Sequence, residues 1–275
     1  MEKTTSSSKK GRNLAMTPKR VWRIMTGLIL VLLAFQGFHV MSETLGYNNR
    51  LTEYIKHFFN FHSENNFPAF ISALFLMFAG VLSLIMGYSS GSEVFENNKR
   101  WKVLGYLFFF LAFDEAIQIH EVISRGIRNN LGDQLPDFLH YAWVIPYGLL
   151  VGGAVVYFLR FVWNLPSKIR NLIILAGFVY VLGALGLEMA ESYVYTQVGI
   201  DNLWYRFLVT AEESMEMFGI TIMCYALMHH LSDHSIHIHF RADQVVQSIQ
   251  SKPRISRPRR RVLRANRRIS SPSHL

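Results

Sequence analysis

The stretch Trp101–Ile123, WKVLGYLFFFLAFDEAIQIHEVI, decides how this chain folds. Its first half is mostly apolar, whereas its second half carries Asp114, Glu115, His120 and Glu121. A run of about 20 largely apolar residues is long enough to cross the hydrocarbon of a bilayer as a helix. An ionised carboxylate in hydrocarbon is costly, so acids placed there require a partner or a function. The stretch therefore predicts a membrane helix that contributes to a functional site.

Five further apolar stretches of similar length lie on either side of this one. Together they predict six membrane spans, at about 21–41, 68–88, 101–123, 139–163, 169–190 and 204–228. The helices of a soluble bundle would show polar faces, which these stretches lack. The predicted fold class is therefore all-α, a polytopic membrane bundle of six transmembrane helices, with a membrane domain at 21–228.

Basic residues gather at the two ends of the chain. Residues 1–23 hold seven Lys and Arg, and residues 241–275 hold ten, out of 28 in the whole chain. Each end has one acidic residue of the 19, so the middle is net acidic. Because cytoplasmic segments of membrane proteins are rich in Lys and Arg, both termini are predicted to be cytoplasmic. We expect an integral protein of a bacterial inner membrane or a plasma membrane.

Three segments lie outside the predicted spans. Residues 1–20 are expected to form a disordered basic tail, 42–67 an amphipathic helical loop on the outer surface, and 229–275 a His-rich and then Arg-rich cytoplasmic tail. Because the Arg-rich tail follows a span, anionic lipids are its expected partner, beside the bilayer itself. Nucleic acid is not an expected partner, and the oligomeric state is left open.

Acidic residues recur in the third, fifth and sixth predicted spans. They are Asp114, Glu115, Glu121, Glu188, Glu191, Glu212, Glu213 and Glu216. At 1.5 Å per residue, all three helices place these acids in the outer half of the bilayer. Helix neighbours such as Glu188 and Glu191 repel each other unless cations bridge them, protons neutralise them or water reaches them. The acids are therefore predicted to meet in one outer-leaflet site.

Helical spacing also predicts how the third span presents its polar residues. At 100° per residue, Asp114, Gln118 and Glu121 form one stripe about 60° wide, with Glu115 to its side. The same geometry predicts that His120 points away from Asp114. At the same outer level, the fourth predicted span adds His140.

Carboxylates with few imidazoles are typical of sites for hard or borderline cations, so we expect a divalent metal ion, namely iron, manganese, magnesium, calcium or zinc. The candidate metal ligands are Glu115, Glu121, Glu188, Glu191, Glu212, Glu216 and His140. The candidate catalytic residues, which would transfer protons, are Asp114, Glu213 and His120. Cys224 is the only cysteine, which excludes an intramolecular disulfide and a cysteine-based metal site.

Three functions are compatible with these residues. The first is a metal-dependent enzyme that acts on a lipid or another membrane-borne substrate. The second is a cation or proton transporter, in which the carboxylates bind and release an ion. The third is a structural membrane protein whose protonated Glu residues form a hydrogen-bonded network. The sequence alone leaves open whether the protein is an enzyme.

The Phe113–Glu121 segment, taken with the acids of the fifth and sixth spans, resembles uncharacterised bacterial multi-pass membrane proteins that carry a similar Asp-Glu…His-Glu helix. The resemblance covers about residues 100–228 and implies a shared site without supplying an activity. Membrane hydrolases of the ceramidase and progestin-receptor-like type fit less well. Their His-x-x-x-His pattern is missing from the last span, they have seven spans rather than six, and Glu predominates in this chain.

Overall fold

The computed structural model describes residues 14–47, 49–63, 65–89, 98–131, 134–233 and 239–240. The chain divides into a large unit, Ala15–Ile238, and a second unit made of Met1–Leu14 and His239–Leu275. Nearly all of the second unit lies outside the described residues. The predictions for the Arg-rich tail and for most of the N-terminal tail therefore concern residues that are not described.

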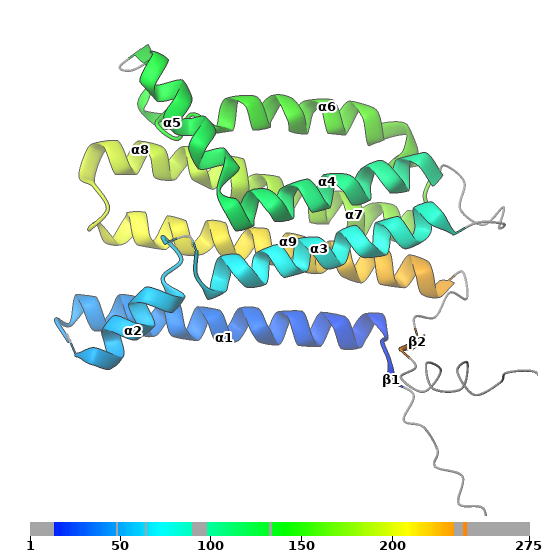
Figure 1. Ribbon diagram of the computed structural model, residues 1–275, viewed down its shortest axis with the longest axis horizontal. Coiled ribbons are helices and arrows are strands. Elements are labelled where there is room, and N and C mark those ends of the chain that lie inside the picture. The colour runs from blue at the N-terminus through cyan, green and yellow to red at the C-terminus, as the bar shows by residue number, and fades with distance from the viewer. Residues whose placement is uncertain are drawn as a thin grey trace, which may run out of the picture. The chain divides into compact units, whose positions relative to one another are not determined.

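Helices build the large unit (Figure 1). In chain order they are α1 (Pro18–Thr44), α2 (Arg50–Phe59), α3 (Phe67–Tyr88), α4 (Asn98–Ile117), α5 (Ile119–Leu131), the 3-10 turn η2 (Asp137–Leu139), α6 (Val144–Trp163), α7 (Ser167–Val181), the π-helix η3 (Leu182–Leu187), α8 (Glu188–Val198) and α9 (Leu203–Asp233). The strands within the described residues, β1 (Leu14–Ala15) and β2 (His239–Phe240), are two residues long. The predicted all-α class is confirmed.

Four helical stretches of the described chain are long and apolar enough to cross a membrane: 18–44, 67–88, 144–163 and 167–198, where α7, η3 and α8 run on as one helix. The bent pair α4–α5 brings the number to five if it counts as one span. Long stretches of apolar surface on these helices are exposed, as lipid-facing surfaces are. The chain is therefore a helical membrane protein.

The third predicted span is not one continuous helix. Its helix stops at Ile117 and restarts at Ile119, and the two parts are bent by 71°. Gln118, between them, has φ +60°, a left-handed conformation that residues other than glycine seldom adopt. The helix of the fourth predicted span, α6, begins at Val144 rather than at 139, because η2 and a turn take up the residues before it.

Side-chain caps fix where several helices begin. The Thr17 hydroxyl accepts a hydrogen bond from the amide of Arg20 at the start of α1, and Asn66 accepts one from Ala69 at the start of α3. Asn49 and Thr52 form a reciprocal capping box that starts α2, the helix within the predicted outer loop. Each cap satisfies an amide that would otherwise lack a partner in the first turn.

Helix α9 lies at the centre of the bundle, in contact with α1, α3, α7 and α8, while α3 and α4 pack along each other. Glycines allow the closest approaches, since a Cβ at Gly219 would lie 2.8 Å from the backbone nitrogen of Tyr180, and one at Gly183 would lie 3.1 Å from the carbonyl oxygen of Glu212. Small residues at such crossings are typical of membrane helix pairs. They bring the backbone of α7 and η3 directly against the acidic part of α9.

Polar contacts tie α1 and α2 to α9 at one end of the bundle. The buried Gln36 side chain donates to the Thr210 hydroxyl, 3.0 Å away, and accepts from the amide of Phe61 at 3.2 Å. Near the same end, the Glu43 carboxylate pairs with Lys56 of α2 at 2.5 Å and with Arg206 of α9. These contacts hold the first two helices beside the acidic helix.

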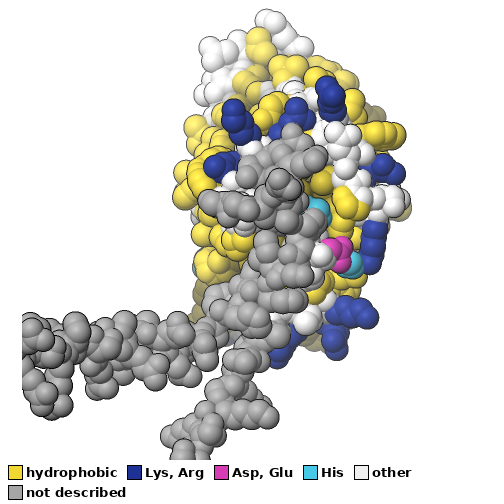
Figure 2. Space-filling view, turned by 90° about the vertical axis from the view of Figure 1, so that its right-hand side faces the viewer, with side chains coloured by type: hydrophobic (Ala, Val, Ile, Leu, Met, Phe, Trp, Pro, Cys, Tyr) yellow, Lys and Arg dark blue, Asp and Glu magenta, His cyan; other side chains and the backbone are white. Residues whose placement is uncertain are grey.

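The opposite end of the bundle is basic. Figure 2 looks at this end, where α1, α4 and α7 begin and α3, α6 and α9 end, and Lys and Arg side chains surround it. They are Lys19, Arg20, Arg23, Lys99, Arg100, Lys102, Arg160, Lys168 and Arg170. Asp233 is the acidic side chain that the described residues place at this end.

The substitution Gly219→Ala tests the close crossing of α7 and α9. The added Cβ meets the Tyr180 backbone, so we expect a loss of about 1–3 kcal/mol of stability, seen as a lower thermal midpoint in detergent. Gly27→Ala on α1 is the matched control, since nothing lies within 4 Å of its Cβ. Equal midpoints for the two variants would contradict the crossing.

Candidate metal centre

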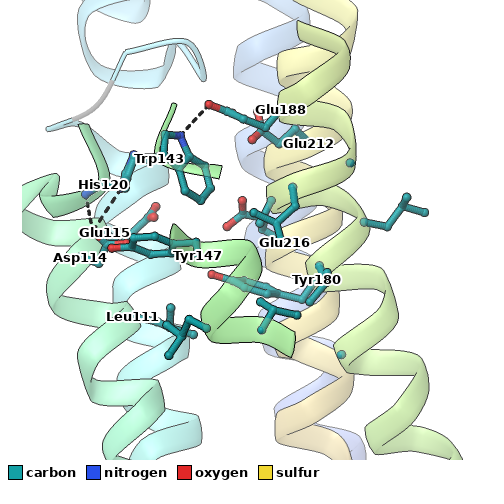
Figure 3. A pocket seen from close by; sticks show the side chains of 18 of the residues that line it. Leu111, Asp114, Glu115, His120, Trp143, Tyr147, Tyr180, Glu188, Glu212 and Glu216 are labelled. Atoms are coloured by element: carbon teal, nitrogen blue, oxygen red, sulfur yellow. Dashed lines mark hydrogen bonds and ion pairs between the residues drawn. The ribbon is translucent and has the colours of Figure 1, made fainter. Parts of the chain in front are cut away.

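A large cavity lies between α4, α6, the α7–α8 helix and α9. Its volume is about 1360 Å³, and every acidic residue singled out in the sequence lines it: Asp114, Glu115, Glu121, Glu188, Glu191, Glu212, Glu213 and Glu216. Figure 3 shows acids from α4, α8 and α9 facing one another across this space. Four separate helices, α4, α5, α8 and α9, therefore present their acids to one site.

The tightest group within the cavity is formed by Glu188, Glu191 and Glu212. One carboxylate oxygen from each lies within 4.8 Å of the other two, and all three residues are buried. Glu188 and Glu191 are three residues apart on α8 and share a face, whereas Glu212 comes from α9. We call this group the glutamate triad. Oε1 of Glu191 is buried and has no hydrogen-bond partner among the residues that the structure describes.

A π-helix places the triad. Residues Leu182–Leu187 form η3, and Glu188 is the first residue of the α-helix that follows. A π-turn inserts an extra residue into the helix, which rotates the side chains beyond it relative to those before it, and such turns are frequent at functional sites. Gly183, inside η3, permits the contact with the Glu212 backbone. The sequence signal for this feature is limited to the run Gly183-Ala184-Leu185-Gly186, which has no helical periodicity of its own.

The break after α4 forms the opposite wall of the cavity. Oδ1 of Asp114 accepts a hydrogen bond from the backbone amide of His120, at 2.8 Å. The same oxygen lies 3.3 Å from His120 Nδ1. The prediction that His120 points away from Asp114 was wrong, because the chain turns at Gln118. The predicted Asp114–Gln118–Glu121 stripe is wrong for the same reason, since Glu121 belongs to α5 and pairs there with Arg125.

Further acids and aromatic residues line the space between the triad and this wall. Glu115 projects from α4 and Glu216 from α9, and both point into the cavity together with Tyr147 and Tyr180 (Figure 3). Tyr180 interacts with Glu216 through its side chain. The triad is thus one part of a larger acidic chamber, in which Glu213 is a lining residue outside the triad.

The segment before α6 closes the chamber, and sequence reasoning did not identify this role. The indole Nε1 of Trp143 donates to Glu188 Oε1 at 2.9 Å. Ser192, fully buried on α8, accepts from the amide of Tyr141 at 3.1 Å and donates to the carbonyl of Asp137 at 2.9 Å. The amide of Ala142 donates to Ser124 of α5 at 3.0 Å. Residues 137–143 therefore connect α5 to α8 beside the triad.

His140, a predicted metal ligand, lies in this segment and is not one of the three residues of the triad. Its Nε2 accepts from the Arg128 guanidinium at 2.5 Å, and both residues line the cavity. Partial burial and the positive charge of Arg128 lower the pKa of His140. A neutral imidazole at this position suits its role as the acceptor of that bond.

The chemistry of the triad follows from the repulsion of its charges. Three ionised carboxylates this close, away from water, repel one another strongly, so the group requires shared protons or a cation. Hard divalent cations prefer carboxylate oxygens as ligands, and three of them converge here. Oε1 of Glu191, which has no hydrogen-bond partner among the described residues, is available to bind such an ion. The residues present could hold one metal ion.

The family model described as a domain of unknown function, DUF8692, matches residues 23–231 of the chain. The matched range includes every acidic residue that lines the cavity. No curated protein and no solved structure matches the chain. The chemistry is therefore argued from the site itself.

The substitution Ser192→Ala tests the link between residues 137–143 and α8. It removes the partner of the Tyr141 amide and of the Asp137 carbonyl, and burying unpaired backbone groups costs about 1–3 kcal/mol. We expect a correspondingly lower midpoint in thermal unfolding. Thr196→Ala, on the exposed face of the same helix, is the control and should change stability by less than about 0.5 kcal/mol. Similar effects of the two substitutions would refute the assigned role.

Proposed function

The chain belongs to the family of the domain of unknown function DUF8692, and from its site we propose that it is a multi-pass membrane enzyme. It binds one divalent metal ion at Glu188, Glu191 and Glu212 and acts on a lipid or another membrane-borne substrate. The observation that carries this proposal is the convergence of three buried carboxylates within 4.8 Å. Their oxygen ligands favour magnesium, manganese, calcium or iron over zinc.

The metal ion would polarise a bound substrate or activate water, and the surrounding residues would accept and donate protons. Asp114 and His120 are a hydrogen-bonded acid and imidazole on the wall facing the triad, which supports a role as proton acceptor and donor. Glu115 and Glu216 supply further carboxylates in the same chamber. Trp143 holds Glu188 in position through its indole N–H.

The lining of the cavity favours an enzyme over a transporter. A pathway for ions requires polar groups along its length, whereas here the acids occupy one part of the cavity and apolar side chains of α4, α6 and α7 line the rest. An acidic chamber that continues into apolar surface suits a substrate with a polar head and a hydrocarbon body.

The proposed topology has six spans, with both termini in the cytoplasm. Helix α9 would be the sixth span, although its acids keep it outside the group of plainly apolar helices. The basic end described above supports this orientation, because Lys and Arg concentrate on the cytoplasmic side. The acids then lie toward the outer surface of a bacterial inner or plasma membrane.

Metal content tests the proposed site. We expect about one equivalent of divalent metal in the purified protein by elemental analysis, and a loss of at least ten-fold in Glu191→Gln and Glu212→Gln. Glu53→Gln, an acid of α2 that does not line the cavity, should leave the content unchanged. A folded preparation made without chelators that contains no metal would sink the proposal. Metal-dependent uptake of ions into proteoliposomes would support a transporter in place of the proposed enzyme.

Topology is tested with reporter fusions. A phosphatase that is active only outside the cytoplasm should be inactive when fused after residue 275 and active when inserted in the loop after α2, near residue 64. A fluorescent protein that folds in the cytoplasm should give the reverse pattern. Phosphatase activity at the C-terminal fusion would contradict the cytoplasmic location of the termini.

A further inference from the structure

The part of the cavity that the metal chemistry does not use is a long apolar groove, formed by one face each of α4, α6 and α7. On α6 the lining residues recur at helical spacing, as Leu150, Val151, Ala154, Val155, Phe158, Leu159 and Val162. From Tyr147 to Val162 this face is about 22 Å long, at 1.5 Å per residue. The whole cavity, at about 1360 Å³, exceeds the roughly 300–1,000 Å³ of small-molecule pockets.

The groove is continuous with the acidic chamber, and its polar groups are confined to that end. Among the residues that line the cavity, the described Lys and Arg side chains are Arg125 and Arg128, and both belong to α5 beside the chamber. Arg128 reaches His140, which connects through Tyr141 and Ser192 to the helix of the triad. Cations, imidazole and carboxylates thus stand at one end, and hydrocarbon side chains extend away from them.

This arrangement matches the two ends of one ligand. We infer that the cavity binds a lipid phosphate, a molecule with a phosphate group and a long hydrocarbon chain. The phosphate lies at Arg128 and His140 and reaches toward the metal of the glutamate triad, and the chain lies in the groove of α4, α6 and α7. Guanidinium groups and metal ions are the groups that recognise phosphate oxygens in proteins. This inference rests on the proposed metal enzyme and names its substrate class.

The loose packing of α6 gives the chain a way in. Helix α6 packs against α7 and, through side chains such as Phe161 on Trp101, against α4, and many of its apolar side chains are exposed. Val155 and Leu159 line the groove and are nevertheless 57 % and 59 % exposed. A hydrocarbon chain can therefore enter the groove from the bilayer without leaving an apolar environment, while the phosphate stays at the level of the helix ends.

Glycines offer a clean test of the chain position. Gly177 lines the groove and has nothing within 4 Å of its Cβ position, so Gly177→Phe fills the groove without a backbone clash. Ala154→Phe fills it from α6. Gly153→Phe is the matched control, because Gly153 is equally open but does not line the cavity. Binding of hexadecyl phosphate to the full-length protein in a phosphate-free maltoside detergent is measured by native mass spectrometry.

The wild-type protein should bind hexadecyl phosphate at least ten-fold more tightly than hexadecanol, and more tightly than inorganic phosphate. Gly177→Phe and Ala154→Phe should each weaken this binding at least ten-fold, with Gly153→Phe unchanged. Arg128→Gln should weaken binding of the phosphate but not of hexadecanol, and Arg50→Gln on α2 should change neither. Competition by phosphatidic acid and by a polyprenyl phosphate identifies the natural type of chain.

Equal binding of hexadecyl phosphate and hexadecanol, or groove variants that bind like the wild type while remaining folded and monodisperse, would overturn the inference. Elemental analysis of the same samples separates it from the proposed function. Metal present without preference for the alkyl phosphate contradicts the lipid phosphate alone. Alkyl phosphate bound with the expected variant effects and no metal supports the lipid site and contradicts the metal enzyme.

Discussion

The structure depends on how the chain stabilises carboxylates that are buried where water is scarce. Glu188, Glu191 and Glu212 are all buried, and each raises the cost of ionising the other two. Such a group is tolerated only if surrounding elements exclude lipid and supply protons, donors or a cation. This explains why the helix that carries Glu212 lies at the centre of the bundle, in contact with α1, α3, α7 and α8.

Local backbone features serve the same requirement. The glycines at the crossing of α7 and α9 bring two backbones together, so that acids from η3–α8 and α9 meet at short range. The turn at Gln118 directs α5 away from the bundle axis and lets the Asp114 carboxylate accept the amide of His120 in the first turn of the new helix. Residues 137–143 then cover the remaining side, and Trp143 gives Glu188 a donor. Each departure from regular helix lies beside an acid.

The positions of the helices and the convergence of the acids on one site could be predicted from the sequence. The break at Gln118, the π-turn and the hydrogen bonds of Ser192, which shape the cavity wall, could not. Apolar length predicted the helices, and the i, i+3 spacing of Glu188 and Glu191 with the depth of Glu212 predicted a common site. At the break, Gln118 has φ +60° and the Asp114 carboxylate accepts the amide of His120; helical periodicity shows neither feature, so a regular helical wheel misplaced His120. The π-turn and the bonds of Ser192 leave no periodic signal.

The weak attachment of α6 separates two properties that most binding sites combine. The acidic chamber is fixed by hydrogen bonds among α5, residues 137–143 and α8, whereas α6 packs against α7 and meets α4 through side chains such as Phe161 on Trp101. Substitutions along the groove face of α6 therefore alter the space for a chain without moving the carboxylates. Under the proposed function, such substitutions would change the length or shape of the chain that is accepted while the chemistry at the head stays constant. Selectivity and reactivity are in this sense independently evolvable.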